Sequence, residues 1–233
     1  MINLLLLALG PIFIIILYVY FKDKYDKEPK GLLLSSFLLG AVVSIIITTL
    51  IYVGFDILLP LEDKYSVPQQ FVKAFLVVAL TEEFSKYIIV RFFAQPRDAF
   101  DEPFDGIMYA VMVSMGFAAT ENVLYVLEGG YATGLLRAFT AVPAHATFGI
   151  LMGYFMGKAK FSKHRIRLNL LGLLLAVTFH GLYDFFLFIE FVPGIWVGAF
   201  ISLILGIILS HKAMKIHQEN SNFNPKNDQT KVL

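Results

Sequence analysis

The chain has 233 residues, of which 58% are hydrophobic and 16% charged, and its formal net charge is +1. It contains no cysteine, which excludes disulfide bonds, thiolate nucleophiles and cysteine-bound zinc. This composition is typical of a polytopic membrane protein and leaves little sequence for a separate soluble domain.

The apolar stretches of the chain are the first structural signal. A helix needs about 20 mostly apolar residues to cross a bilayer. Seven stretches meet this requirement, at about 2–21, 32–59, 71–93, 106–127, 134–157, 168–189 and 195–213. We therefore predict an all-α fold, a polytopic membrane helix bundle of about seven transmembrane helices. The first stretch has no basic region before it, so we expect a retained helix rather than a cleaved signal peptide.

The bundle is predicted to form one transmembrane domain, residues 1–215. The polar, asparagine-rich residues 216–233 lack the apolar surface needed to fold alone, so we expect a disordered cytoplasmic tail there. Fifteen of the 19 lysines and arginines follow the first, third, fifth and seventh stretches, whereas the opposite side has only Lys64, Lys73 and Arg137. The positive-inside rule then predicts an N-terminus outside and a C-terminus in the cytoplasm.

Eight polar residues interrupt the apolar stretches and are the candidate functional residues. They are Glu82, Glu83, Lys86, Glu121, Asn122, His145, His180 and Asp184. A charge at mid-bilayer costs about 2.5–3.5 kcal/mol, so these side chains are expected to converge inside the bundle rather than face lipid. At 1.5 Å per residue, the acids and histidines of four helices fall between mid-depth and the outer leaflet. The sequence therefore predicts one buried site.

Spacing within each helix suggests different roles for the two adjacent glutamates. Glu82 and Glu83 diverge by about 100° around a helix, so they cannot form a face-to-face pair. Lys86 lies within reach of both, at i+4 and i+3, and His180 shares a helix face with Asp184 at i+4. We expect one glutamate, preferably Glu82, to face a cavity while Glu83 pairs with Lys86.

Simpler structural interpretations apply to several polar residues. The Glu83–Lys86 pair could only fix helix packing, and Glu121 with Asn122 could only join helices by hydrogen bonds. Pro143 lies within the fifth stretch and is expected to kink that helix. The remaining histidines are expected to be solvated surface residues, at positions His164, His211 and His217.

Known hydrolase motifs narrow the chemistry. The sequence has no HExxH motif, no GxSxG elbow and no GxGD partner for Tyr183-Asp184. For hydrolysis there remains a carboxylate that activates water, with imidazoles to orient the water and stabilise the oxyanion.

Several of these segments resemble the motifs of the PrsW family of bacterial membrane proteases. The similar segments are EEFSK at 82–86, FAATEN at 117–122, the His145 region, HGLYD at 180–184, FKDKYDKEP at 21–29, FDEPFDGIMYA at 100–110 and MGKAKFS at 156–162. The family is related to the CAAX prenyl endopeptidase and Abi group, with motifs EExxxR, FxxxH and HxxxN/D. The resemblance implies a glutamate-dependent protease of the bacterial cytoplasmic membrane, which makes the first, extracytoplasmic-side cut in a single-pass anti-sigma factor under envelope stress.

The resemblance also implies residue roles. Glu82 corresponds to the glutamate that activates water, and Glu83 is its companion near Lys86, which replaces an arginine at one residue less spacing. Glu121 stands in place of the histidine of FxxxH, which leaves open whether Glu121 or His145 assists the base. His180 and Asp184 match HxxxN/D, the pair expected to polarise the scissile carbonyl.

Two alternatives remain open from the sequence. No cofactor is favoured, although zinc could be held by Glu121, His145 and His180 with an open water position. A proton-linked transporter or channel could use the same acids and histidines as a relay, but the cytoplasmic halves of the helices supply few relay groups. A scaffold without catalytic activity is a third interpretation. The expected partners are the lipid bilayer and the membrane-protein substrate, with no nucleic acid.

Overall fold

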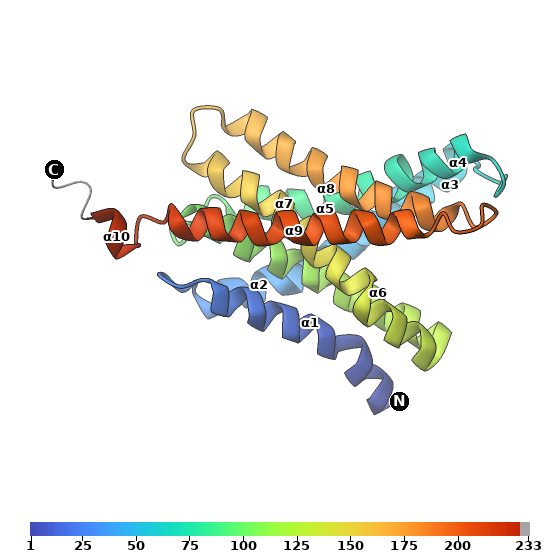
Figure 1. The fold of residues 1–233 in the computed structure, drawn as a ribbon, viewed down its shortest axis with the longest axis horizontal. Coiled ribbons are helices and arrows are strands. Elements are labelled where there is room, and N and C mark those ends of the chain that lie inside the picture. The colour runs from blue at the N-terminus through green and yellow to red at the C-terminus, as the bar shows by residue number, and fades with distance from the viewer. Residues whose placement is uncertain (229–233) are drawn as a thin grey trace.

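The computed structural model describes residues 1–228, and every element in that part of the chain is helical (Figure 1). The prediction of an all-α fold is confirmed. The elements, with π-helical segments denoted η, are α1 (Ile2–Lys22), α2 (Lys30–Leu39), η1 (Gly40–Ser44), α3 (Ile45–Leu58), α4 (Val67–Val72), η2 (Lys73–Ala79), α5 (Leu80–Ile89), η3 (Val90–Ala94), α6 (Pro103–Phe139), α7 (Ala141–Lys160), α8 (Arg165–Phe188), α9 (Val197–Glu219) and α10 (Pro225–Asp228).

Long apolar helices dominate the bundle, as expected where lipid cannot hydrogen-bond to the backbone. Within residues 1–228, five helical stretches are long and apolar enough to cross a membrane: Ile2–Lys22, Lys30–Leu58, Pro103–Lys160, Arg165–Phe188 and Val197–Glu219. One of these contains both α6 and α7, which pack against each other. The protein is therefore of the multi-pass membrane type, whereas seven crossings and the orientation of the termini stay predictions.

Helix α6 forms the core of the bundle. All its residues from 104 to 119 are buried. Its contact with α7 is made by backbone, because a Cβ atom added at Gly153 would lie 2.3 Å from the Gly106 carbonyl oxygen. Small residues at helix contacts allow such close approach in membrane proteins, and here they bring α7 with His145 next to α6.

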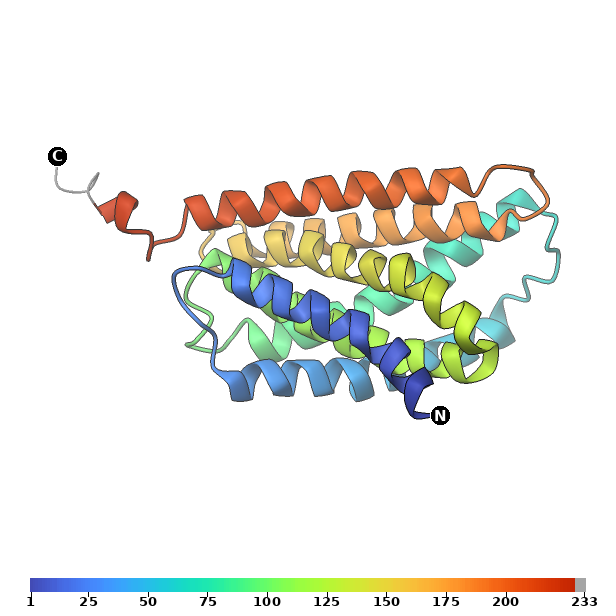
Figure 2. The same cartoon turned by 60° about the horizontal axis from the view of Figure 1, so that its bottom comes forward.

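The last part of α6 reverses direction at Gly130. This glycine has φ of 70°, a left-handed conformation that costs other residues free energy. Residues 131–139 consequently run back beside the preceding part of the helix, at the end of the bundle that also contains the N-terminus (Figure 2). The reversal returns Arg137 to the level of Glu121.

Pro143 does not kink a helix, contrary to the expectation from sequence. Helix α7 begins at Ala141, so Pro143 is its third residue. The first-turn N–H groups of a helix have no intrahelical acceptor, and proline is tolerated there without loss of a hydrogen bond.

Helix α5 lies between two π-helical segments, η2 and η3. Such segments are rare and frequently occur at functional sites. The acidic and basic residues of α5, Glu82, Glu83 and Lys86, are all buried. The three ionisable residues therefore lie in a short regular helix whose two ends are locally widened.

The ends of the bundle differ in charge. The loops 23–29, 95–102 and 161–164 lie at one end with the end of α9 (Figure 2), and we name this the lysine-rich end.

His217 was expected on the surface but is 2% exposed, because it stacks on the Tyr154 ring and bonds to the Tyr154 carbonyl oxygen at 2.9 Å. The division at residue 215 stays a prediction; α9 continues to Glu219, and residues 229–233 lie outside the described part.

Candidate active site

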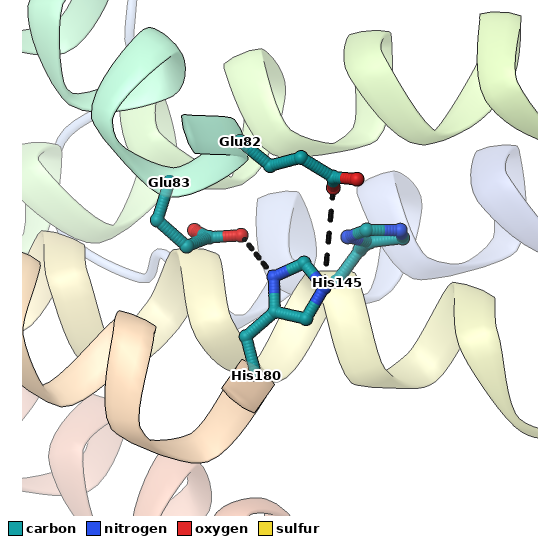
Figure 3. A group of neighbouring side chains, drawn as sticks. All are labelled: Glu82, Glu83, His145 and His180. Carbon is teal, nitrogen blue, oxygen red and sulfur yellow. Dashed lines mark hydrogen bonds and ion pairs between the residues drawn. The ribbon is translucent and has the colours of Figure 1, made fainter. Parts of the chain in front are cut away.

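Side chains from α5, α7 and α8 meet inside the bundle. Glu82, Glu83, His145 and His180, which we name the acid–histidine cluster, each offer a ligand atom within 4.8 Å of the others, and all four are buried (Figure 3). Asp184 joins the cluster from the next turn of α8, at 3.2 Å from His180 Nε2. The residues that the sequence placed at one depth therefore lie together.

Glu83 forms the inner side of the cluster. Its Oε1 atom accepts hydrogen bonds from Lys86 Nζ at 2.7 Å and from His180 Nδ1 at 2.9 Å. Its side chain is 0% exposed. This geometry matches the predicted Glu83–Lys86 pair and shows that Glu83 also fixes the His180 ring.

Lys86 supplies a positive charge to three of the four cluster residues. Its Nζ atom lies 2.7 Å from Glu83, 3.6 Å from Glu82 Oε2 and 3.3 Å from His145 Nδ1. The ammonium group also lies 4.2 Å from the centre of the Phe117 ring, a cation–π contact. Lys86 therefore partly compensates the two carboxylates that α5 brings into the core.

His145 connects the cluster to Glu121. Because its Nδ1 accepts from Lys86, its Nε2 carries the proton donated to Glu121 Oε2 at 2.9 Å, which indicates the neutral tautomer. Glu121 also pairs with Arg137 Nη2 at 2.6 Å. Arg137 Nε donates to Asn122 Oδ1 at 2.7 Å. Arg137 was counted from sequence as an outer-side charge, but the reversal at Gly130 makes it part of the site's surroundings.

His180 lies at the centre of the cluster. Carboxylates face both of its ring nitrogens, Glu83 at Nδ1 and Asp184 at Nε2, an arrangement suited to an imidazolium that donates from both. Glu82 Oε2 is 3.9 Å from His180 Nε2. The Phe148 ring stacks on the imidazole at 4.7 Å between centroids, so the orientation of His180 is fixed by packing as well as by charge.

A cavity of about 580 Å³ borders the cluster. Its lining includes Glu82, Glu121, His145, His180 and Asp184. In the part of the chain that the structure describes, Glu83 and Lys86 do not belong to this lining. The distinction agrees with the expectation that Glu82 faces the cavity while Glu83 serves as its companion.

The two carboxylate oxygens of Glu82 have different environments. Oε1 accepts a hydrogen bond from the Tyr52 hydroxyl at 2.8 Å. Oε2 is buried, and no hydrogen-bond donor reaches it from residues 1–228. A buried carboxylate oxygen is normally satisfied, so Oε2 is the oxygen of Glu82 that keeps its lone pairs free to accept a proton.

Tyr52 and Arg137 are site residues that the sequence interpretation missed. Ser44, Thr48 and Tyr52 recur every four residues and so share one helix face, which was the available signal for Tyr52. For Arg137 the signal was the Gly129-Gly130 pair, which permits a chain reversal between Glu121 and Arg137.

The acid–histidine cluster is also chemically suited to a metal ion. Two carboxylates and two imidazoles form a donor set typical of zinc, and both Glu82 Oε2 and Glu83 Oε2 are buried without a hydrogen-bond partner among the described residues. This set differs from the Glu121, His145 and His180 set considered from sequence. Glu121 contacts His145, but the same carboxylate oxygen is also paired with Arg137 at 2.6 Å. A metal ion would place a further positive charge beside the Lys86 ammonium, which lies 2.7 Å from Glu83 Oε1 and 3.3 Å from His145 Nδ1.

The fold and site together define a multi-pass membrane protein with a buried acid–histidine site beside a cavity. A family model described as "PrsW family intramembrane metalloprotease" matches residues 28–210. The chain belongs to this family, which confirms the resemblance seen in its motifs. It is therefore a membrane-embedded protease, a hydrolase that acts on membrane proteins.

Curated relatives agree with this assignment. A protein named Protease PrsW from Geobacillus kaustophilus is 38% identical over 201 residues, covering 86% of each chain. The Bacillus subtilis protein of that name is 38% identical over 182 residues, covering 77% of this chain and 80% of the relative. The Clostridioides difficile protein is 35% identical, covering 81% of each. No solved structure matches the chain. The relatives are bacterial proteases, so a transporter or channel is not favoured.

Proposed function

We propose that this chain is an endopeptidase of the bacterial cytoplasmic membrane that cleaves a single-pass membrane protein with a water molecule activated by Glu82. One observation carries this proposal: Glu82, whose buried Oε2 atom accepts no hydrogen bond from residues 1–228, lines the same cavity as His145, His180 and Asp184. A general base must have a free lone pair within reach of water.

The proposed reaction proceeds through a tetrahedral intermediate. Water in the cavity transfers a proton to Glu82 Oε2 while its oxygen bonds to the scissile carbonyl carbon, and the carbonyl electron pair moves to oxygen. The positive charge of the His180 imidazolium, held between Glu83 and Asp184, stabilises that oxyanion. The carbon–nitrogen bond then breaks as Glu82 returns the proton to the leaving amine.

The surrounding residues receive supporting roles in this proposal. Glu121, which lines the cavity, assists by holding water next to Glu82, and His145 orients Glu121 through its Nε2 hydrogen bond. Lys86 and Asn122 stabilise the arrangement, through Glu83 and Arg137 respectively. Zinc held by Glu82, Glu83, His145 and His180 would instead supply a metal-activated water. We favour the glutamate because Lys86 already compensates part of the negative charge of this donor set.

The substrate we propose is a single-pass anti-sigma factor cut on its extracytoplasmic side. The motif resemblance supports this substrate class. The arrangement of the loops supports the orientation, since the lysine-rich end would face the cytoplasm and the N-terminus the exterior. A peptide would then reach the cavity from the outer leaflet.

The test is co-expression of the protein with single-pass anti-sigma factors of its host. Wild-type protein is expected to produce a shortened fragment, and Glu82→Gln is expected to reduce its rate of appearance by roughly 10²–10⁴-fold, the contribution typical of a general base. Glu190→Gln, an exposed acid after α8, is the matched control. An uncut substrate beside active wild-type protein on another substrate would contradict the anti-sigma assignment.

The catalytic type is tested on the purified protease. Cleavage that persists in strong chelator, with no zinc retained, is expected for the glutamate. Loss of cleavage in chelator that added zinc restores would overturn the glutamate and support the metal.

A further inference from the structure

The Ser44–Thr48–Tyr52 face of η1 and α3 is attached to the helical turn that carries Glu82. The Ser44 hydroxyl is hydrogen-bonded to the Ser85 hydroxyl, and Thr48 Oγ1 donates to Ser85 Oγ at 3.1 Å. Ser85 Oγ in turn donates to the Glu82 carbonyl oxygen at 2.7 Å. One turn further along α3, Tyr52 reaches the Glu82 carboxylate itself. Both the backbone and the side chain of Glu82 are therefore held from one neighbouring helix.

The Tyr52 contact makes the two oxygens of Glu82 unequal. A phenol hydroxyl that donates to Oε1 fixes the carboxylate rotamer and leaves Oε2 without a hydrogen-bond partner among the described residues. Oε2 is also the oxygen nearer the basic groups, at 3.6 Å from Lys86 Nζ and 3.9 Å from His180 Nε2. The free oxygen thus points toward the groups that would stabilise a reacting water and an oxyanion.

From this geometry we propose that Tyr52 is a positioning residue for the proteolytic reaction: its hydroxyl holds Oε1 of Glu82 so that Oε2 is the oxygen that accepts the proton of water. The inference rests on the proposed role of Glu82 as the base. It assigns a function to α3, a helix that contributes none of the catalytic candidates identified from sequence.

The structure argues against a purely structural role for this hydroxyl. Tyr52 is only partly buried and lines the cavity together with Glu82, whereas the packing of α3 on α5 is already secured by the buried Ser44, Thr48 and Ser85. Loss of the Tyr52 hydroxyl should consequently leave the helix contact intact and change only the carboxylate.

The test compares Tyr52→Phe with Tyr87→Phe in steady-state cleavage of a substrate that wild type cuts and Glu82→Gln does not. Tyr87 is the matched control because it lies on α5 and its ring stacks with Phe84 rather than with a residue of the site. A hydrogen bond to a charged group corresponds to about 10- to 100-fold in rate. Tyr52→Phe is therefore expected to lower kcat by that factor with KM unchanged within twofold, and Tyr87→Phe to change neither.

A double-mutant cycle isolates the contact. Glu82→Asp withdraws the carboxylate by one methylene group, so Tyr52→Phe is expected to cost less than about threefold in that background. An unchanged kcat in Tyr52→Phe overturns the inference, and so does a raised KM alone, which would make Tyr52 a substrate contact. Poor membrane accumulation or a lowered melting temperature of Tyr52→Phe would show a structural hydroxyl and equally overturn it. If wild type itself cuts no membrane protein, the proposed function fails first.

Discussion

At the residue scale, the balance between Glu83 and Lys86 decides whether the site can exist inside the bundle. Both side chains are almost completely buried, with 0% and 2% exposure, and their atoms are 2.7 Å apart. Breaking a buried ion pair by removing one partner is far costlier than replacing both, because an uncompensated charge is left behind. The pair is thus a requirement for folding around Glu82 as well as a means of orienting His180.

Removal of the Lys86 charge is expected to destabilise the protein. Lys86→Met keeps the apolar stem of the side chain but leaves the Glu83 carboxylate without its closest cation, at a cost of about 3–5 kcal/mol. The measurement is denaturant unfolding of the purified protein in detergent micelles.

The second variant distinguishes charge from packing. Adding Glu83→Gln to Lys86→Met removes the uncompensated charge and is expected to recover more than half of the lost stability, although His180 then loses one of its two carboxylate partners. A double variant no more stable than Lys86→Met would show that packing of the lysine stem, not charge, causes the loss.

At the scale of elements, α6 and α7 position the site through backbone contact. The Gly106 and Gly153 backbones approach so closely that a side chain on either would collide with the other. The interior of a helix bundle behaves as a close-packed solid, so separating these helices would also displace His145 from Lys86 and Glu121.

A methyl group at this contact is expected to destabilise the bundle. Gly153→Ala would place Cβ 2.3 Å from a backbone oxygen, and such overpacking costs about 1–3 kcal/mol. Gly54→Ala, within α3, meets no atom within 4 Å and should be neutral or stabilising by up to about 1 kcal/mol. Thermal unfolding of both variants in micelles measures the difference; equal melting temperatures would contradict the close contact.

At the scale of the whole molecule, the loop between α1 and α2 at the lysine-rich end contains two buried acids. Asp23 and Glu28, from the loop between α1 and α2, are 2% and 3% exposed. Burial, opposed by Lys27 and reinforced by Glu102, raises the pKa of Asp23 to about 7. Burial and the charge of Asp105 raise the pKa of Glu28 to about 10. Both acids therefore hold protons in the folded protein that they release on unfolding near neutral pH.

The expected consequence is lower stability at higher pH. An acid whose pKa is raised by folding contributes full stability below its unfolded pKa and loses it as pH rises through the folded pKa. The contribution of Asp23 to the free energy of unfolding should decrease between about pH 4 and 7, and that of Glu28 should decrease up to about pH 10. For each acid the decrease is at most about 1.4 kcal/mol per pH unit. Melting temperature measured from pH 5 to 9 should decline.

Two variants test whether Asp23 causes the decline of the melting temperature with pH. Asp23→Asn is expected to flatten the decline below pH 7, whereas Asp98→Asn, an exposed acid near the same end, should leave the profile unchanged. A profile that rises over this range, or that Asp23→Asn does not alter, would contradict protonation of Asp23 in the folded state.

The candidate site was predictable from sequence to the extent that it depends on depth and helix spacing. The cost of charge in lipid requires Glu82, His145 and His180 to face inward, and i,i+3 or i,i+4 spacing pairs Glu83 with Lys86 and His180 with Asp184. The all-helical fold follows for the same reason, since a helix satisfies its own backbone in a bilayer. Pro143 and His217 were misassigned because helix ends and distant partners are not visible in local patterns.

By itself, the sequence thus determined the all-helical, multi-pass membrane fold, the convergence of the buried polar residues and the family to which the chain belongs. Only the tertiary structure decided that Tyr52 holds one oxygen of Glu82 and that Arg137 returns to Glu121. The physical reason is that periodicity tells which residues share a face of one helix, whereas the neighbour that faces them depends on how helices far apart in sequence pack together.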